Sequence, residues 1–276
     1  MVRIKNFAGM VLLLLVVLFA FSACSKQPAE KSQETPKTQV ALTVSAAASL
    51  KDAMNEIKDI YAEEAPDVNV TYNFASSGSL QRQIENGADV DVFLSAANKQ
   101  MDALETKGLL EDGTKKTLLG NSLVLIIPKD SSLVSSFEDL TKDTVKKVGL
   151  GELKTVPAGQ YAEDLFTKMN ILDKIKAKAV YGKDVKEVLT WVETGNVDAG
   201  IVYLSDAKVS QKVKQVAVAP EGSHKPIVYP ASVIKSSKHL AEAKAFLEFL
   251  SGAKAKSVFE KYGFIFLGNA QSKSAA

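Results

Sequence analysis

The sequence predicts an α/β fold of two lobes, each a mostly parallel sheet flanked by helices, joined by two crossovers of the chain. From residue 40 onward, short β-rich runs alternate with helical patterns, which is typical of βαβ units. The alternation forms two successive sets, and the last third adds elements that we expect to return to the first set. The 237 residues from position 40 to the end are enough for one large or two modest α/β domains.

The first set contains three strand–helix pairs. Each opens with a short β-rich run and continues with apolar residues spaced as on one face of a helix, such as Ile57 and Tyr61. Pro66, Gly87 and Gly108 follow the three helical patterns, and residues of these types end helices. The expected segments, strands and helices in turn, are 41–44, 50–61, 68–74, 78–86, 91–94 and 99–107.

The second set begins with a very apolar run that Pro128 stops. Its strands are expected at 123–127, 148–150, 179–181 and 199–203, and its helices at 158–169 and 186–193. The last third contains a strand near 227–234 and an amphipathic helix over 240–250.

These elements lead to a prediction of the domain organisation. We place the two crossovers near 120–121 and near 224–229. Lobe 1 is then expected to comprise residues 40–121 and 225–268, lobe 2 residues 122–224, and a flexible tail residues 269–276.

The N-terminus is typical of an export signal. Arg3 and Lys5 precede an apolar run over 7–23, and Cys24 follows the residues Phe-Ser-Ala. This pattern predicts a signal peptide over residues 1–23 and a lipid on Cys24, which would anchor the protein to the membrane. The alternative is an uncleaved N-terminal anchor, although the run is short for a span of about 20 residues. Both interpretations place the folded part outside the cytoplasm.

Residues 24–39 are expected to form a disordered tether after the lipidated cysteine. They are polar, contain two prolines and lack an apolar anchor. The first 39 residues carry a net charge of +3 in a chain of net charge +2, which leaves −1 for the remainder. This balance argues against nucleic acid as a partner. Cys24 is the only cysteine, so disulfides within the chain and cysteine metal sites are excluded.

Two serines stand where a strand gives way to a helix. Ser49 follows the run at 41–44, and Ser77 follows the run at 68–74. Helix N-termini carry unpaired N–H donors and the positive end of the helix dipole, so two that converge can bind a small oxyanion. The alternative for each serine, considered alone, is a purely structural role as a helix N-cap.

Three further positions could donate hydrogen bonds in the second set. Pro157 in a first turn leaves the next N–H groups free to face a ligand. Asp184 is expected to cap a helix that begins with a free N–H at Val185. Tyr203 ends a strand and carries a hydroxyl that could donate, unless it is an ordinary core tyrosine.

The chain resembles the molybdate-binding proteins of ABC transporters, which have the type II periplasmic-binding-protein fold. The matching strings, spread in order between residues 40 and 267, are AAASL at 46–50, FASS at 74–77, LLGNS at 118–122, VPAG at 156–159, GIVY at 200–203 and KYGF at 261–264.

Together with the N-terminal pattern, the resemblance implies a lipid-anchored, extracytoplasmic binding protein that captures molybdate and tungstate between its lobes. It implies ligand contacts through two serines, two backbone amides and a tyrosine hydroxyl, which are Ser49, Ser77, Ala158, Val185 and Tyr203 in this sequence. The implied partners are the oxyanion and the membrane permease subunits of an ABC importer, with the protein itself a monomer and without a cofactor. Neutral donors would favour a fully deprotonated dianion over hydrogen phosphate, whose proton would lack an acceptor. Sulfate stays open as an alternative ligand.

Other classes are less favoured by the sequence. An enzyme would need a base near a nucleophilic serine, yet His224 and His239 are the only histidines and no Gly-x-Ser-x-Gly string occurs. A ferric-iron-binding protein of the same fold would need tyrosine ligands, often adjacent, and no Tyr-Tyr pair occurs. Asp89 and Asp91 could share a metal ion, but the simpler interpretation is that they form a structural pair or lie at a solvent-exposed strand edge.

Overall fold

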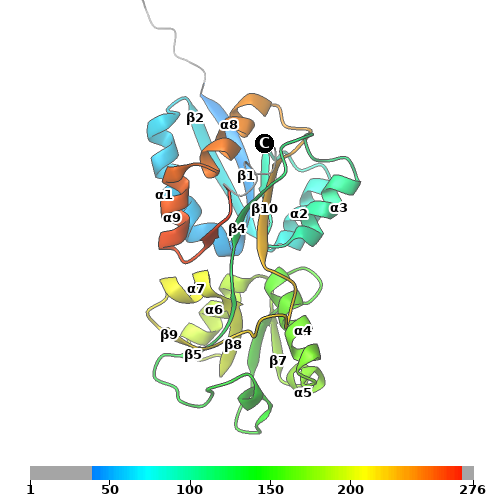
Figure 1. The fold of residues 1–276 in the computed structure, drawn as a ribbon, viewed down its shortest axis with the longest axis vertical. Helices are drawn as coiled ribbons and strands as arrows, with labels where there is room; N and C mark the ends of the chain where they lie inside the picture. Colours follow the sequence, from blue (N-terminus) through cyan, green and yellow to red (C-terminus); the bar gives the residue numbers. More distant parts are fainter. Residues whose placement is uncertain (1–38, 269–276) are drawn as a thin grey trace, which may run out of the picture. The chain divides into compact units, whose positions relative to one another are not determined.

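The computed structural model describes residues 39–268, which fall within one compact unit of the chain. The predicted signal peptide, the lipidated Cys24, the tether up to residue 38 and the tail from residue 269 lie outside the described residues. Within the described range the strands form one sheet of six strands and one of five, both flanked by helices (Figure 1). The two-lobed α/β architecture is therefore confirmed.

The first sheet is assembled from both ends of the described range, in the strand order β11-β4-β10-β3-β1-β2. Its strands are β1 (Val40–Ala47), β2 (Val68–Ala75), β3 (Val92–Leu94), β4 (Lys116–Gly120), β10 (Val228–Val233) and β11 (Ile265–Phe266). The helices around it are η1 (Ala48–Leu50), α1 (Lys51–Glu64), α2 (Ser77–Glu85), α3 (Asn98–Thr106), α8 (Leu240–Leu250) and α9 (Ala253–Lys261).

Strand β3 explains why helices cover both faces of this sheet. Successive side chains of a strand point to opposite faces. Phe93 packs with Leu80 of α2 and Met101 of α3, whereas Val92 and Leu94 belong to the larger core that includes residues of α1, α8 and α9. In Figure 1, α2 and α3 accordingly lie on one side of the sheet and α1, α8 and α9 on the other.

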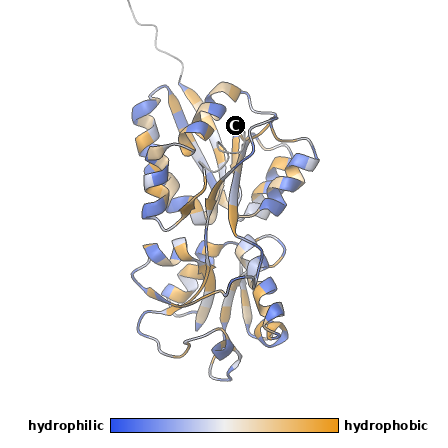
Figure 2. Cartoon of the chain, in the orientation of Figure 1, coloured by the Kyte–Doolittle hydropathy of each residue, from blue (hydrophilic) through white to orange (hydrophobic). Residues whose placement is uncertain are grey.

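The second sheet has the strand order β7-β6-β8-β5-β9. Its strands are β5 (Leu123–Pro128), β6 (Val148–Gly151), β7 (Ala179–Gly182), β8 (Ala199–Tyr203) and β9 (Val213–Val218). Its helices are η2 (Glu138–Thr141), α4 (Pro157–Lys168), α5 (Leu172–Lys176), α6 (Val185–Glu193) and α7 (Leu204–Val209). Figure 2 shows apolar residues along the strands of both sheets, with polar residues on the helices.

The strand directions are more mixed than expected and correct one part of the prediction. β2, β1 and β3 run parallel, as do β7, β6 and β8. However, β10 is antiparallel to β3 and β4, and β5 is antiparallel to β8 and β9. The reason is connectivity: β5 and β10 each follow a strand of the other sheet along the chain. A strand that enters from the side on which its neighbours end must run opposite to them.

The chain passes from the first sheet to the second between Gly120 and Leu123, and it returns between Val218 and Val228. All the strands and helices expected from the sequence are present, with ends that differ by at most three residues. The elements that sequence patterns missed are mainly short or lie at sheet edges: β4, β9, β11, η2, α5, α7 and α9.

None of the helices in residues 39–268 combines the length and the hydropathy that crossing a membrane requires.

Candidate functional site

All five residues predicted to bind an anion line one small cavity. Ser49 lies in η1 directly after β1, and Ser77 is the first residue of α2 after β2. Ala158 and Val185 lie in the first turns of α4 and α6, and Tyr203 is the last residue of β8. The residues thus come from both sheets, each from a place where a strand ends or a helix starts.

Neither serine acts as a helix cap. Ser77 Oγ accepts a hydrogen bond from the backbone N–H of Ala96 at 2.9 Å, and no side chain caps α2. Ser49 Oγ lies 2.9 Å from the hydroxyl of Tyr229, and no side chain caps η1 or α1. Both serines are buried, with Ser77 fully so. The alternative of ordinary N-caps is therefore wrong for these two residues.

The start of α4 is held against the end of β6 by two glycines. A Cβ added to Gly159 would lie 2.1 Å from the carbonyl oxygen of Gly151, so only glycine allows this approach. Pro157 occupies the first turn, where its missing N–H costs no helical hydrogen bond. The N–H of Ala158 is in the same turn, so no carbonyl earlier in the helix can accept from it.

The start of α6 is set by Asp184, as the sequence predicted. Asp184 Oδ1 accepts the N–H of Glu187 at 3.0 Å, which makes Asp184 the N-cap. The following N–H, that of Val185, has no partner within the helix because it belongs to the first turn. Asp184 is the only carboxylate among the residues that line the cavity within the described range, and its Oδ1 is occupied by the cap.

Tyr203 carries a buried hydroxyl for which residues 39–268 provide no hydrogen-bond partner. Only 1 % of the residue is exposed. Burial raises the pKa of Tyr203 well above its ordinary value, and the nearby Tyr229, Tyr161 and Asp206 act in the same direction. The group is therefore a neutral donor at physiological pH, and it lines the same cavity as Ser49 and Ser77.

A lysine lies next to the cavity, but two carboxylates neutralise it. Lys186 Nζ lies 2.6 Å from Asp52 Oδ2 and 3.1 Å from Asp206 Oδ1. Burial lowers the pKa of Lys186, but Asp206 and Asp52 more than offset this and leave it raised. Burial also raises the pKa of Asp206, which is fully buried, and Lys186 opposes that shift. An anion in the cavity would thus be held by neutral donors.

Three contacts join elements of the first sheet to elements of the second near the cavity. The N–H of Gly78 in α2 donates to the carbonyl of Thr155 at 3.0 Å. The ion pair of Lys186 and Asp52 joins α6 to α1, and Gln100 of α3 donates to Gln160 of α4 at 3.4 Å. The cavity that remains has a volume of about 10 Å³ open to the centre of a water molecule, which is room for about one water.

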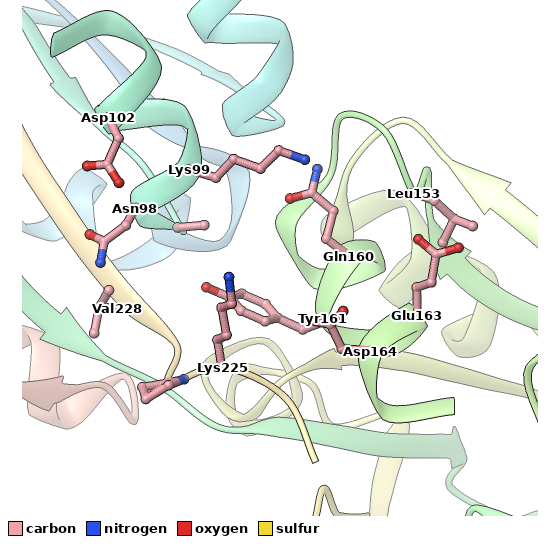
Figure 3. A pocket seen from close by; sticks show the side chains of 12 residues that line it. Asn98, Lys99, Asp102, Leu153, Gln160, Tyr161, Glu163, Asp164, Lys225 and Val228 are labelled. Carbon is pink, nitrogen blue, oxygen red and sulfur yellow. The ribbon is translucent and has the colours of Figure 1, made fainter. Parts of the chain in front are cut away.

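A larger pocket of about 820 Å³ lies between α3, α4 and the returning crossover, and Figure 3 shows Lys99 and Gln160 pointing toward one another across it. It shares no lining residue with the small cavity. Its lining includes the carboxylates of Asp102, Glu163 and Asp164, together with Lys99 and Lys225. Because charges of both signs line it, this pocket is a poor site for a small anion.

The carboxylates considered as a metal pair have structural partners instead. Asp91 accepts hydrogen bonds from the N–H of Thr43 at 2.7 Å and the hydroxyl of Ser237 at 2.5 Å. Asp89 lies 3.2 Å from Lys238 Nζ. No group of three or more His, Cys, Asp or Glu residues within 39–268 is arranged to hold a metal ion. Asp91 therefore has a buried structural role and Asp89 a surface ion pair, which agrees with the simpler interpretation of these two residues.

Sequence reasoning missed Tyr229, the residue that contacts Ser49. Its hydroxyl also accepts a hydrogen bond from Asn121 Nδ2 at 3.3 Å, and Asn121 Nδ2 donates in addition to Ser205 Oγ at 2.9 Å. Tyr229 and Asn121 lie in or beside the two segments expected to carry the crossovers. That position was the available signal, because chain crossings in a two-lobed fold must lie next to anything bound between the lobes.

Comparison with known proteins agrees with this geometry. The family model for bacterial extracellular solute-binding proteins matches residues 42–265. The molybdate-binding protein ModA of Haemophilus influenzae is 45 % identical over 229 residues, which cover 81 % of this chain and 89 % of that protein. The lipoprotein YvgL of Bacillus subtilis, provisionally named as an ABC transporter substrate-binding protein, is 44 % identical over 91 % of this chain and 96 % of its own length.

A solved structure from Clostridium difficile, the substrate-binding domain of a transporter provisionally assigned to molybdenum, is 49 % identical with a TM-score of 0.65. It covers 83 % of this chain and 99 % of its own. The resemblance inferred from the sequence strings is thereby confirmed, as is the type II binding-protein fold. This chain belongs to the family of bacterial extracellular solute-binding proteins, among relatives named for molybdate.

Proposed function

We propose that this protein is the substrate-binding component of an ABC importer and that it captures molybdate and tungstate in the small cavity. The observation that carries this proposal is the set of neutral donors around the cavity, above all the buried hydroxyl of Tyr203 that lacks a partner within the described residues. A buried polar group without a partner costs about 1–3 kcal/mol. A ligand that accepts a hydrogen bond from the Tyr203 hydroxyl would remove that cost.

The donors suit a fully deprotonated oxyanion. The hydroxyls of Ser49, Ser77 and Tyr203 and the amides of Ala158 and Val185 can all donate. Each hydrogen bond to a charged acceptor contributes on the order of 1.5–3 kcal/mol. In these roles all five groups donate, and Asp184, the one carboxylate in the lining within the described residues, already caps α6 through Oδ1, so a proton carried by the anion would lack an acceptor among them. Molybdate, tungstate and sulfate carry none at neutral pH, whereas hydrogen phosphate does.

The names of the relatives favour molybdate within this class. The Haemophilus influenzae relative is named as a molybdate-binding protein and is 45 % identical to this chain. Sulfate has the same charge and shape but is smaller, so the separation of the two anions depends on the size of the occupied cavity. Tungstate closely resembles molybdate in size and charge, and we include it for that reason.

The proposed mechanism is closure of two lobes on the anion. Lobe 1 comprises residues 40–121 and 225–268, and lobe 2 comprises residues 122–224. Closure would bend the chain where it passes between the sheets, after Gly120 and before Val228. The contact of Gly78 with Thr155 and the small volume of the cavity indicate a nearly closed arrangement, from which the lobes would move apart to admit an oxyanion, which is larger than a water molecule. The permease subunits of the importer would recognise the closed form.

The proposed location is outside the cytoplasm, with a lipid on Cys24 as the membrane anchor. The relative YvgL, which is similar over 91 % of this chain, is named as a lipoprotein. Binding, not catalysis, is the proposed role, and no cofactor is part of it.

Thermal unfolding with separate additions of molybdate, tungstate, sulfate, phosphate and ferric iron tests the proposal. A ligand at a thousand times its dissociation constant stabilises the folded state by about 4.1 kcal/mol. We expect a raised midpoint with molybdate and tungstate only. An equal shift with sulfate would change the ligand and keep the site. An unfolding midpoint that no anion raises, or that ferric iron alone raises, would contradict the proposal.

A further inference from the structure

We propose that Tyr229 is a positioning residue that fixes Ser49 as a hydrogen-bond donor and so helps the site to reject protonated oxyanions. The inference rests on the proposed function, because it concerns the same anion site. It starts from the two hydrogen bonds of the Tyr229 hydroxyl, to Ser49 Oγ at 2.9 Å and from Asn121 Nδ2 at 3.3 Å.

The direction of these bonds follows from a backbone amide. The N–H of Ser122 can only donate, and it lies 2.9 Å from Asn121 Oδ1, so this atom of Asn121 is the acceptor. The amide nitrogen of Asn121 must then face the other way, where it donates one hydrogen to Ser205 Oγ and the other to Tyr229 Oη. The orientation of Asn121 is thereby determined.

The tyrosine can now donate in one direction only. Its oxygen accepts from Asn121, and Asn121 Nδ2 offers no lone pair in return. The remaining partner of the Tyr229 hydroxyl among the described residues is Ser49 Oγ, so Tyr229 donates its hydrogen to Ser49. Tyr229 is 1 % exposed, so bulk water does not compete for that hydrogen.

The consequence for Ser49 is that its own hydrogen is left for a ligand. If the Ser49 hydroxyl turned its hydrogen toward Tyr229, two hydrogens would meet and the Tyr229 hydrogen would lack an acceptor. A buried donor without an acceptor is costly. Ser49 therefore presents a hydrogen to the cavity, and an anion that carries its own proton meets a donor instead of an acceptor.

Ser77 shows the same arrangement built from the backbone. Its oxygen accepts the N–H of Ala96 at 2.9 Å, which likewise leaves the Ser77 hydrogen for the cavity. One serine is thus oriented by a main-chain amide that only proline would remove, and the other by a side chain that can be changed. Tyr229 is the position at which this orientation can be tested.

The test is a double-mutant cycle in the full-length protein, with the molybdate dissociation constant measured by calorimetry for wild type, Tyr229→Phe, Ser49→Ala and the double variant. Phenylalanine keeps the ring packing against Phe264, at 5.4 Å between ring centroids, and removes only the hydroxyl. We expect Tyr229→Phe to weaken binding roughly tenfold when Ser49 is present, and less than about twofold when Ser49 is alanine. Equal weakening in both backgrounds would overturn the proposal, because Tyr229 would then not act through Ser49.

A second readout separates positioning from a general loss of structure. At about pH 8 inorganic phosphate is mostly a dianion that keeps one proton. We expect Tyr229→Phe to narrow the preference for molybdate over phosphate in competition, by roughly tenfold, because the freed Ser49 oxygen can accept that proton. A merely structural role of Tyr229 would weaken the binding of both anions by the same factor. An unchanged preference for molybdate over phosphate therefore counts against the positioning role of Tyr229.

The matched control is Tyr61→Phe. Tyr61 is also a buried tyrosine of the first sheet's core, where it packs against Phe246 and Phe249, and it does not line the cavity. The Tyr61→Phe substitution should leave both the affinity for molybdate and the preference for molybdate over phosphate unchanged. A wild-type protein that does not bind molybdate would contradict the proposed function, whereas additive effects in a protein that does bind it would contradict only the role of Tyr229.

Discussion

The two halves of the candidate site present different kinds of donor. The half built on the first sheet presents side-chain hydroxyls, those of Ser49 and Ser77. The half built on the second sheet presents main-chain N–H groups at the starts of α4 and α6, with the Tyr203 hydroxyl beside them. The difference shows that one cavity can be assembled from donors that depend on residue type and from donors that depend only on backbone geometry.

This difference has consequences for substitution. A serine hydroxyl disappears with one change of side chain. A main-chain N–H persists through almost every substitution and is lost only to proline. This contrast leads to four predictions, and the first concerns a substitution that would push the two halves apart.

Gly78→Ala should have the largest effect on binding, because it acts where the two halves touch. An added Cβ would lie 2.6 Å from the carbonyl oxygen of Thr155 and 2.8 Å from its Cα, both backbone atoms that cannot turn aside. Overpacking of this kind costs about 1–3 kcal/mol, so the molybdate affinity should fall tenfold or more by calorimetry.

Stability should respond differently to the same change. In the proposed mechanism the lobes separate without ligand, which moves Gly78 away from Thr155, so only the better helix propensity of alanine, up to about 1 kcal/mol, then acts on stability and the unfolding midpoint should stay or rise. Gln81→Ala, further along α2 and outside the cavity lining, is the control and should bind as wild type does, because the Gln81 side chain bonds only to Glu85 among the described residues. Unchanged binding by Gly78→Ala would mean that this close contact is not needed for the bound state.

Removal of either serine hydroxyl should weaken binding next most strongly. Ser49→Ala and Ser77→Ala should each cost about 1–3 kcal/mol of molybdate binding, since each deletes one donor to a charged acceptor. Ser45→Ala serves as the control, because Ser45 is a buried serine of β1, the strand that leads to Ser49, and its hydroxyl has no partner in the described residues. If both site variants bound as tightly as the control, the first half of the site would be wrongly assigned.

Val185 tests the second half of the comparison. Val185→Pro removes the N–H but keeps the helix, because proline is favoured at a first helical position and Asp184 before it is already extended. The affinity should fall by on the order of 1 kcal/mol or more. Val185→Ala keeps the N–H and should change the affinity by less than about twofold, although it removes buried methyl groups and lowers stability. Equal affinities for the proline and alanine variants would exclude this amide as a donor.

Alkaline pH should have the smallest effect. Burial raises the pKa of Tyr203 well above the ordinary tyrosine value of about 10. A raised pKa keeps the neutral hydroxyl form present below that ordinary value, and its donor is lost only as pH climbs through the raised one. The molybdate affinity should therefore change by less than about twofold between roughly pH 7 and 9. A steep loss within this range would show that Tyr203 titrates as an exposed tyrosine.

The sequence determined the helix and strand pattern and most of the residues that meet at the cavity. Periodicity located the helices, and local chemistry marked their starts: Pro157 in the first turn of α4 and Asp184 as the cap of α6. These signals are local, because backbone conformation and capping depend on neighbours along the chain. These local signals, together with the strings that resemble molybdate-binding proteins, allowed the five residues to be named before their positions in space were known.

Only the tertiary structure decided how the side chains pair. Tyr229 lies 180 residues from Ser49 along the chain, and Asn121 lies 108 residues from Tyr229, so no sequence period links them. The strand directions also depended on where the chain passes between the sheets, which made β5 and β10 antiparallel to neighbours expected to be parallel. Local patterns determine where helices and strands begin, but the direction in which a hydroxyl donates depends on partners that only folding brings into contact.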